Sequence, residues 1–519
     1  MEIKTSVSYL KNEKCADVYT ESQTDYVLPD YLGDVRKILF SEASLRPSGR
    51  FAGGDEVEFS GIVVYDVIYL DADGRLASAS FSSDYDYSVK CTADSYNDSI
   101  ADTRVSNYAV RLLSPRKINA KASLVGSVRL SEREVHSVSG SGFASDLVPE
   151  VNMGSANLRT VTTSSVCERE YAESVARLDG VIADELAVIY SSAEAVVEDV
   201  RGDENRAYVK GKMRMLAVIQ NGDEPAYSVE KTVSFDEGVD FDGISPEMIL
   251  TPQLTVTSLT SSVNADEGGC EVVLSGIVEM CVIGEQNQSV ELILDAYLKE
   301  VPTDNAYDGF SYTTLRDSVC VKNGHNAELD RSEIESDGLR EVIFLTSTPK
   351  VDETTLSDGV VNILGEIRYS GIASETMGDK ISYLPIRFSS PFEINVNISC
   401  QTDEKCQADV ELHSFDTTAS LDSNKLYASC TIECKVSVSS CEEKSVLSDM
   451  TIVDGESFEN EEARVTVYYP TSSDTLFSVA KRFHTSGLKL AGDNGITEAV
   501  FSSDNPTGSL KGVKRVIIY

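Results

Sequence analysis

Residues 57–70 read VEFSGIVVYDVIYL, and a segment of the same kind, with a glycine inside an apolar alternation, occurs twice more. It returns as AYVKGKMRMLAVI around Gly211 and as VNILGEIRYSGIA around Gly365. The offsets between these glycines are 211 − 61 = 150 and 365 − 211 = 154 residues. Apolar β-branched and aromatic residues that alternate with polar ones are typical of half-buried β-strands. The chain therefore contains three related β-rich segments at a nearly constant spacing.

Two further landmarks keep this spacing. Gly126 is followed 276 − 126 = 150 residues later by Gly276, and Cys430 stands at the corresponding place in the third copy. An apolar triplet begins 23 residues before each of the first glycines; the triplets are Ile38-Leu39-Phe40, Val188-Ile189-Tyr190 and Val342-Ile343-Phe344. Repetition at a fixed period of domain size indicates duplicated domains. We expect a mainly β chain of three related β-sandwich-like repeat domains over residues 1–155, 160–315 and 325–455.

The segments around the landmarks predict hairpins. In the first copy, Val57–Leu70 and Leu76–Phe81 flank Asp73-Gly74, a favoured hairpin turn. Asn221-Gly222 and Gly378-Asp379 stand at the corresponding places, so the turn chemistry is retained while the side chains differ.

Other segments read less regularly. Glu173–Ala187 is the best helical candidate within the copies. Serine-rich residues 137–145 and 160–165 are predicted to separate the first two copies, and polar Thr303–Gly324 the second and third.

The charge is large and unevenly distributed. The chain carries 45 Lys/Arg and 85 Asp/Glu, a net charge of −40. Residues 463–519 hold seven basic and four acidic residues (+3), which leaves −43 for the remainder. An acidic body repels nucleic acid and anionic lipid, so neither is an expected partner. The N-terminal MEIKTSVSYLKNEKCAD lacks the apolar core of an export signal, and no apolar run could span a bilayer, so we expect a cytoplasmic protein.

No catalytic or metal-binding pattern stands out. The four histidines, His136, His325, His413 and His484, are scattered and have no companions at metal or triad spacing. Eleven cysteines are an odd count for a disulfide framework. Cys430 and Cys434 share one face of a strand pattern and are interpreted as small buried hydrophobes and not as zinc ligands. We expect no enzyme, no metal and no cofactor; a hydrolase with an unrecognised site is the low-ranked alternative.

The last segment, residues 463–519, has a different pattern. Val465–Tyr469 predicts a strand, and Val513–Tyr519 a final strand. A helix over LFSVAKRF, which Asp474 can cap, places Leu476, Val479, Ala480 and Phe483 on one apolar face. A second short helix ends near Asn494. The predicted order is β-α-α-β, a small α/β domain.

This pattern resembles the LysM domain through Asp474-Thr475-Leu476-Phe477, Val479-Ala480, Asn494 and Asn505-Pro506. LysM modules bind N-acetylglucosamine polymers through the loop that here holds Ser473 in place of a glycine, a departure that favours a protein ligand. The resemblance implies a partner-binding site at Asp474, Thr475, Phe477, Lys481, Arg482 and Asn494. Phe477, Lys481 and Arg482 fall off the apolar stripe and are predicted to form an exposed docking patch. For Asp474, a role as the N-cap of the helix is favoured over a role in binding a ligand.

Three β-rich repeats followed by one LysM-like domain resemble the SipL family of spore coat morphogenetic proteins, whose repeats are SPOCS domains. The resemblance rests on Val27-Leu28-Pro29, the apolar triplets, and the pairs Gly61/Tyr65 and Gly365/Tyr369; the second copy has Met215 in place of the tyrosine. It implies a sporulation scaffold in the mother-cell cytoplasm, at the forespore surface. Its LysM domain would contact the stage IV morphogenetic ATPase, and the protein would help to assemble other coat proteins. The alternative is a cell-envelope protein that binds peptidoglycan or N-acetylglucosamine, for which an export route would be needed.

Overall fold

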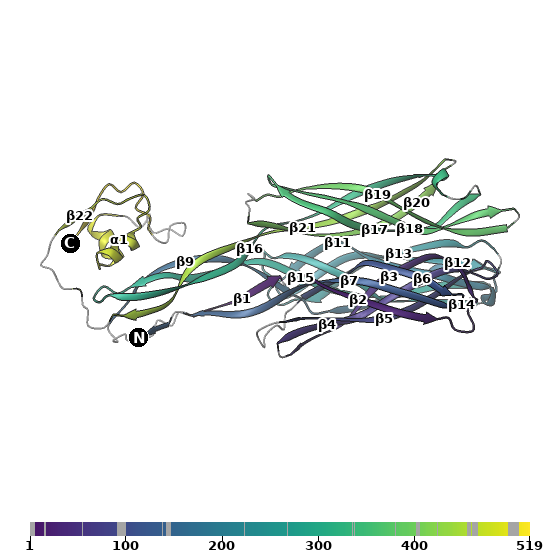
Figure 1. Cartoon of the computed structure of the whole chain (residues 1–519), viewed down its shortest axis with the longest axis horizontal. Coiled ribbons are helices and arrows are strands. Elements are labelled where there is room, and N and C mark those ends of the chain that lie inside the picture. Colours follow the sequence, from purple (N-terminus) through teal and green to yellow (C-terminus); the bar gives the residue numbers. More distant parts are fainter. Residues whose placement is uncertain are drawn as a thin grey trace.

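A computed structural model gives the architecture of the chain, which is mainly β with several antiparallel sheets (Figure 1). The structure describes residues 6–14, 17–53, 55–90, 100–137, 139–141, 147–222, 224–266, 268–334, 336, 338–378, 380–400, 405–422, 424–453, 458, 465–496 and 508–519. Asn505-Pro506, part of the LysM resemblance, lies outside these ranges.

Most strands fall into three consecutive groups of six, called modules 1, 2 and 3. Module 1 contains β2 (Val18–Val27), β3 (Val35–Gly53), β4 (Glu56–Asp71), β5 (Leu76–Lys90), β6 (Ile100–Ser114) and β7 (Lys117–Ser137). Module 2 contains β10 (Cys167–Asp179), β11 (Leu186–Asp203), β12 (Arg206–Asn221), β13 (Tyr227–Asp240), β14 (Ile249–Asp266) and β15 (Gly269–Tyr297). Module 3 contains β16 (Thr303–Asp330), β17 (Leu339–Ser357), β18 (Val360–Met377), β19 (Lys380–Asn397), β20 (Cys406–Leu421) and β21 (Lys425–Ile452).

The three modules have one strand topology. The second, third and fourth strands form an antiparallel meander, as in β3-β4-β5, β11-β12-β13 and β17-β18-β19. The last strand pairs with the first and the fifth, as β7 does with β2 and β6, to give the other sheet. Apolar side chains from both sheets form one core in each module. Each module is thus a pair of facing antiparallel sheets.

The predicted hairpins are confirmed. β4 and β5 pair in antiparallel register from Glu56↔Lys90 to Leu70↔Leu76, and β12–β13 and β18–β19 pair likewise. Gly74, Gly222 and Gly378 in the three turns have φ of +82°, +53° and +64°. Glycine adopts this left-handed conformation without the steric cost that a Cβ brings.

The landmark glycines lie in the middle strand of each meander, beneath an aromatic ring of the next strand. A Cβ on Gly365 would stand 2.2 Å from the carbonyl oxygen of Lys350 and 2.7 Å from the Phe392 ring. Gly211 faces the Val196 carbonyl and Phe235 in the same way, and Gly61 faces the Arg46 carbonyl and Tyr85. Only glycine fits this close approach of backbone and ring.

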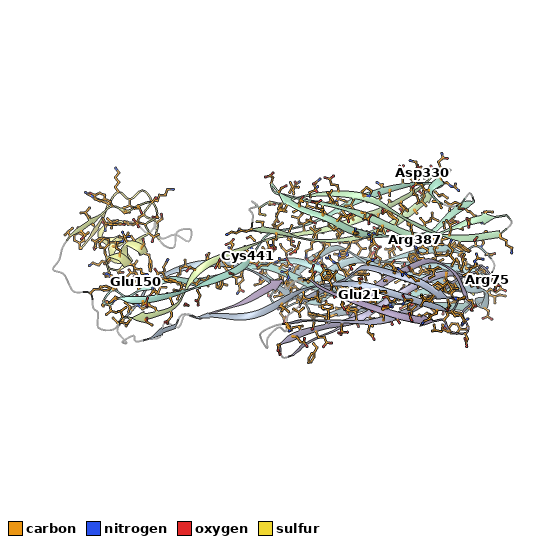
Figure 2. All side chains as sticks on the ribbon, in the orientation of Figure 1. Glu21, Arg75, Glu150, Asp330, Arg387 and Cys441 are labelled. Carbon is orange, nitrogen blue, oxygen red and sulfur yellow. The ribbon has the colours of Figure 1, made fainter. Side chains whose placement is uncertain are left out.

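The apolar triplets bring the modules together. Each triplet carries a β-bulge at its middle residue, because the pairing register jumps between Ile38/Phe40, Val188/Tyr190 and Val342/Phe344. The third residues then meet: the ring centroids are 5.0 Å apart for Phe40–Phe344, 5.1 Å for Tyr190–Phe344 and 5.5 Å for Phe40–Tyr190. We call these three buried residues the central cluster; apolar side chains of all three modules surround it. Arg387 of module 3, labelled in Figure 2, donates to the Leu39 carbonyl of module 1 at 3.5 Å. The modules therefore share a core and form one body.

A stalk leaves one end of the body, opposite the hairpin that carries Arg75 (Figures 1 and 2). It consists of the outer parts of the last strands and their partners. The outer part of β7 pairs with β1 (Ser6–Lys14), that of β15 with β9 (Glu150–Thr163), and that of β21 with the start of β16. β8 (Ser139–Ser141) adds a short parallel pairing to β21. β15 has 29 residues, a length of roughly 90 Å at the usual strand rise. Apolar side chains of β9, β15, β16 and β21 form the stalk core.

Two sequence expectations are wrong. Thr303–Gly324, expected to separate two copies, belongs to β16, which pairs with β21 along its whole length. Glu173–Ala187, expected to be helical, divides between β10, the 3-10 turn η1 (Ala183–Glu185) and β11; η2 (Arg331–Glu333) is a similar turn. Pairing of β10 with β15 overrides the local helix propensity of its Ala, Glu and Arg residues. Of the serine-rich joint 160–165, residues 160–163 lie in β9.

Cys430 and Cys434 are buried in the core of module 3, as predicted, and burial raises the pKa of the Cys434 thiol to about 12. Cys441, by contrast, is exposed on the stalk (Figure 2). In the described part of the chain, no helix combines the length and apolar character required to cross a bilayer.

Candidate partner-binding site

The end of the chain forms a small unit of its own beside the stalk tip (Figure 1). Its described elements follow the predicted β-α-α-β order and are β22 (Thr466–Tyr468), α1 (Leu476–Arg482), α2 (Gly487–Asp493) and β23 (Val516–Ile518). β22 and β23 pair antiparallel. We call residues 465–496 and 508–519 the terminal unit.

The apolar stripe of α1 packs inward, as its helical spacing predicts. Leu476, Val479 and Ala480 are buried, and Phe483 is half-buried against the same core. Leu490 and Val516 join them from α2 and β23, so the two helices cover one face of the two-stranded ribbon.

Asp474 does not cap α1, which corrects the sequence expectation. Thr475 is the N-cap: its hydroxyl accepts from the Ser478 backbone N–H at 3.0 Å, and the Ser478 hydroxyl reaches back to the Thr475 N–H at 2.9 Å. This reciprocal pair is a capping box. The Asp474 carboxylate instead accepts from the Thr471 N–H at 2.7 Å and from the Tyr468 hydroxyl at 2.8 Å. These hydrogen bonds, the backbone one foremost, lower the pKa of Asp474 below its usual value.

Arg482 extends this group. Its Nη1 donates to the Tyr468 hydroxyl at 2.6 Å, and its guanidinium lies 5.4 Å from the centre of the Tyr468 ring. Arg482 remains exposed. These hydrogen bonds join Asp474, Tyr468 and Arg482 in one polar group. The guanidinium of Arg482 is accessible to a partner.

Phe477 and Lys481 face the stalk. Lys481 Nζ lies 2.6 Å from Asp295 Oδ2, and the Phe477 ring meets the Tyr297 ring edge-on at 5.2 Å. The Tyr297 hydroxyl donates to the Thr485 carbonyl at 2.6 Å, and burial raises the pKa of this tyrosine. We call these interactions the stalk contact; Glu150, labelled in Figure 2, marks the stalk tip beside them. Of the patch that the sequence predicted to be exposed, Arg482 is exposed, and Phe477 and Lys481 are half-buried.

Asn494 joins α2 to β23. Its amide donates to the carbonyls of Leu490 at 2.9 Å and Ile517 at 2.7 Å, and its Oδ1 accepts from the Ile517 N–H at 2.6 Å. An asparagine that makes three backbone hydrogen bonds holds the unit together and has little capacity left for a ligand.

Sequence reasoning missed Asp295 and Tyr297. They lie in a strand that belongs to another module, and no local signal indicates that the terminal unit reaches them. Lys481 and Asp295 are 186 positions apart in the sequence, so their contact is visible only in the folded chain.

Comparison with protein-family models and with curated proteins found no match to this chain. Over the described ranges, no group of three or more His, Cys, Asp or Glu side chains is arranged to hold a metal ion.

Proposed function

We propose that this chain is a non-enzymatic scaffold for endospore coat assembly, a SipL-like protein of the mother-cell cytoplasm at the forespore surface. Its three modules are copies of a SPOCS-type domain that link coat proteins. Its terminal unit is LysM-like and docks on the stage IV morphogenetic ATPase.

The shared backbone irregularities of the modules support the duplication. Each meander has a second bulge, directly after the residue that pairs with the landmark glycine. The three bulges lie between Pro47 and Gly49, between Val197 and Asp199, and between Val351 and Glu353. These positions are separated by the same 150 and 154 residues as the glycines (197 − 47 and 351 − 197). Bulges are local features that do not follow from strand pairing in general, so their recurrence at this spacing favours a common origin.

The position of the terminal unit supports docking. It lies beyond the body, at the tip of a long stalk, and its sequence is basic where the rest of the chain is strongly acidic. An extended arm with a unit of opposite charge suits a protein that connects two surfaces. This is the observation that carries the proposal.

Deleting residues 463–519 from the fluorescently tagged chain in sporulating cells tests it. We expect the forespore cap of fluorescence to disappear while circular dichroism and thermal unfolding of the purified truncation retain the β signature of the body. A truncated protein that still forms the cap would contradict the docking role.

The purified full chain provides a second readout. Measurable affinity for chitohexaose, equal to or greater than that for the ATPase, would favour the envelope glycan-binding alternative. We expect binding to the ATPase and none to the sugar.

A further inference from the structure

The outward face of the β22–β23 ribbon is apolar, and the residues that the structure describes leave it exposed. Val467 lies directly opposite Ile517, and Val465 and Tyr469 follow on the same side because side chains alternate along a strand. Val465, Val467, Tyr469 and Tyr519 are 62%, 47%, 70% and 62% exposed. The opposite face carries the buried Val516 and Ile518. The ribbon is thus apolar on both faces, whereas a two-stranded element with one core face usually presents polar residues to water.

The described residues of the ribbon and its adjoining turn carry charge of one sign. Residues 465–470 and 508–519 contain Lys511, Lys514 and Arg515 and no Asp or Glu. All three cations are exposed. An apolar face whose own strands and adjoining turn carry cations complements an acidic surface and repels a basic one.

We propose that the outer face of the β22–β23 ribbon, defined by Val465, Val467, Tyr469, Ile517 and Tyr519, binds an acidic segment of a partner protein that presents apolar side chains. The tyrosines supply the anchors, since partly exposed aromatic side chains carry much of the binding energy of interfaces. Lys511, Lys514 and Arg515 supply attraction at the rim, which raises the association rate and fixes orientation. This inference rests on the proposed docking role and identifies the surface that performs it.

The geometry of α1 favours this face over the helix. Phe477 and Lys481, two of the three α1 residues in the expected docking patch, already contact Tyr297 and Asp295 in the stalk. A partner that used them would first have to displace the stalk contact. The ribbon face needs no such displacement, so the unit can be held by the stalk and bind its partner at the same time.

The test uses the full-length chain and the purified stage IV ATPase as the probe, with affinity measured by biolayer interferometry at low and high salt. The apolar variant is Val467→Ser with Tyr469→Ser, and its control is Leu488→Ser, a 77% exposed leucine on α2. The charge variant is Lys514→Glu with Arg515→Glu, and its control is Lys489→Glu, an exposed lysine on α2.

We expect the apolar variant to bind about tenfold or more weakly, because losing one anchoring side chain of an interface has an effect of this size. The charge variant should also bind more weakly, with a flatter salt dependence, and both controls should bind as the unsubstituted chain does. Thermal unfolding checks that every variant folds, and forespore localisation of the same variants provides a second readout.

The outcomes separate the two proposals. If the chain lacking residues 463–519 still binds and localises, the docking role itself is wrong. If that truncation fails but the apolar and charge variants behave like their controls, the ribbon face is wrong and the docking surface lies elsewhere on the terminal unit. Binding that strengthens with salt, or that transfers to chitohexaose, to vesicles of anionic lipid or to a second copy of this chain, also overturns the acidic protein partner.

Discussion

The central cluster and the Lys481–Asp295 pair of the stalk contact both join distant parts of the chain, yet they differ in how much water reaches them. Phe40, Tyr190 and Phe344 are 1%, 6% and 4% exposed, and each comes from a different module. In the stalk contact, the side chains of Lys481 and Asp295 are 34% and 23% exposed. Burying a large aromatic side chain contributes several kcal/mol, whereas an ion pair open to solvent contributes little. The comparison indicates that the three modules unfold as one unit. In the stalk contact, the buried Tyr297, 3% exposed, holds the terminal unit more firmly than the ion pair does.

The largest effect is expected for Phe40→Ala. Removing this ring leaves a cavity between three modules and should lower the free energy of unfolding by about 3–5 kcal/mol, as buried Phe→Ala changes do. Denaturant unfolding of the full chain measures it. The control is Phe51→Ala, a 70% exposed ring in the same strand, which should change stability by less than about 0.5 kcal/mol. A similar small loss for both variants would mean that the modules do not depend on the shared core.

An intermediate effect is expected at Glu194, on the seam between modules 2 and 3. There Lys212 of β12 pairs with Asp416 of β20 at 2.9 Å, and Arg214 donates to the Thr417 carbonyl at 3.1 Å. Burial raises the pKa of Glu194 to about 7, with Arg214 opposing the rise. Since the folded chain holds this proton more tightly than the unfolded one, its contribution to stability is complete below about pH 4.5 and is lost as the pH rises through 7.

Glu194→Gln should abolish this pH dependence. Relative to pH 8, the unsubstituted chain should gain on the order of 2 kcal/mol at pH 5 from this group, and the variant should lack that gain. Denaturant unfolding at both pH values measures the difference. Glu198→Gln, at an exposed carboxylate of the same strand, is the control and should keep the pH dependence. An unchanged pH dependence in Glu194→Gln would show that the seam is open to water, like the Lys481–Asp295 pair.

The smallest effect is expected in the stalk contact. A double-mutant cycle of Lys481→Ala and Asp295→Ala should give a coupling of about 0.2–1 kcal/mol that falls with added salt. Hydrogen exchange of the α1 amides reports it, because losing the cover of the stalk lowers the local stability of this helix. The surface pair Lys117–Asp25, at 2.7 Å, is the control and should leave α1 exchange unchanged. A coupling of several kcal/mol would make the terminal unit a rigid part of the body.

Local chemistry made the hairpin turns predictable. A turn glycine with positive φ, such as Gly74 or Gly222, follows from steric limits within a few residues of sequence. The apolar stripe of α1 was predictable for the same reason, since helical periodicity alone defines it. The close approach at Gly365 was not predictable in this way, because it involves Lys350 and Phe392 on the neighbouring strands.

The wrong predictions concern residues whose structure is set by contacts and not by their own local preference. Glu173 pairs with Leu274 in a strand, although its neighbours favour a helix, because β15 offers a complete set of backbone hydrogen bonds. Asp474 has the right residue type for an N-cap, but the next residue, Thr475, takes that role while Asp474 bonds Thr471. Phe477 and Lys481 are off the apolar stripe and still half-buried, since Tyr297 and Asp295 cover them from another module.

The sequence by itself determined the β-rich character, the turns, the spacing of the landmarks and the β-α-α-β order of the terminal unit. These features depend on backbone sterics and periodicity, which act over a few residues. Only the tertiary structure decided that three triplets about 150 residues apart share one core, that the last strands extend into a stalk, and that α1 contacts it. Such contacts join segments distant in sequence, and they form because burial of apolar surface across the whole chain outweighs the preferences of any single segment.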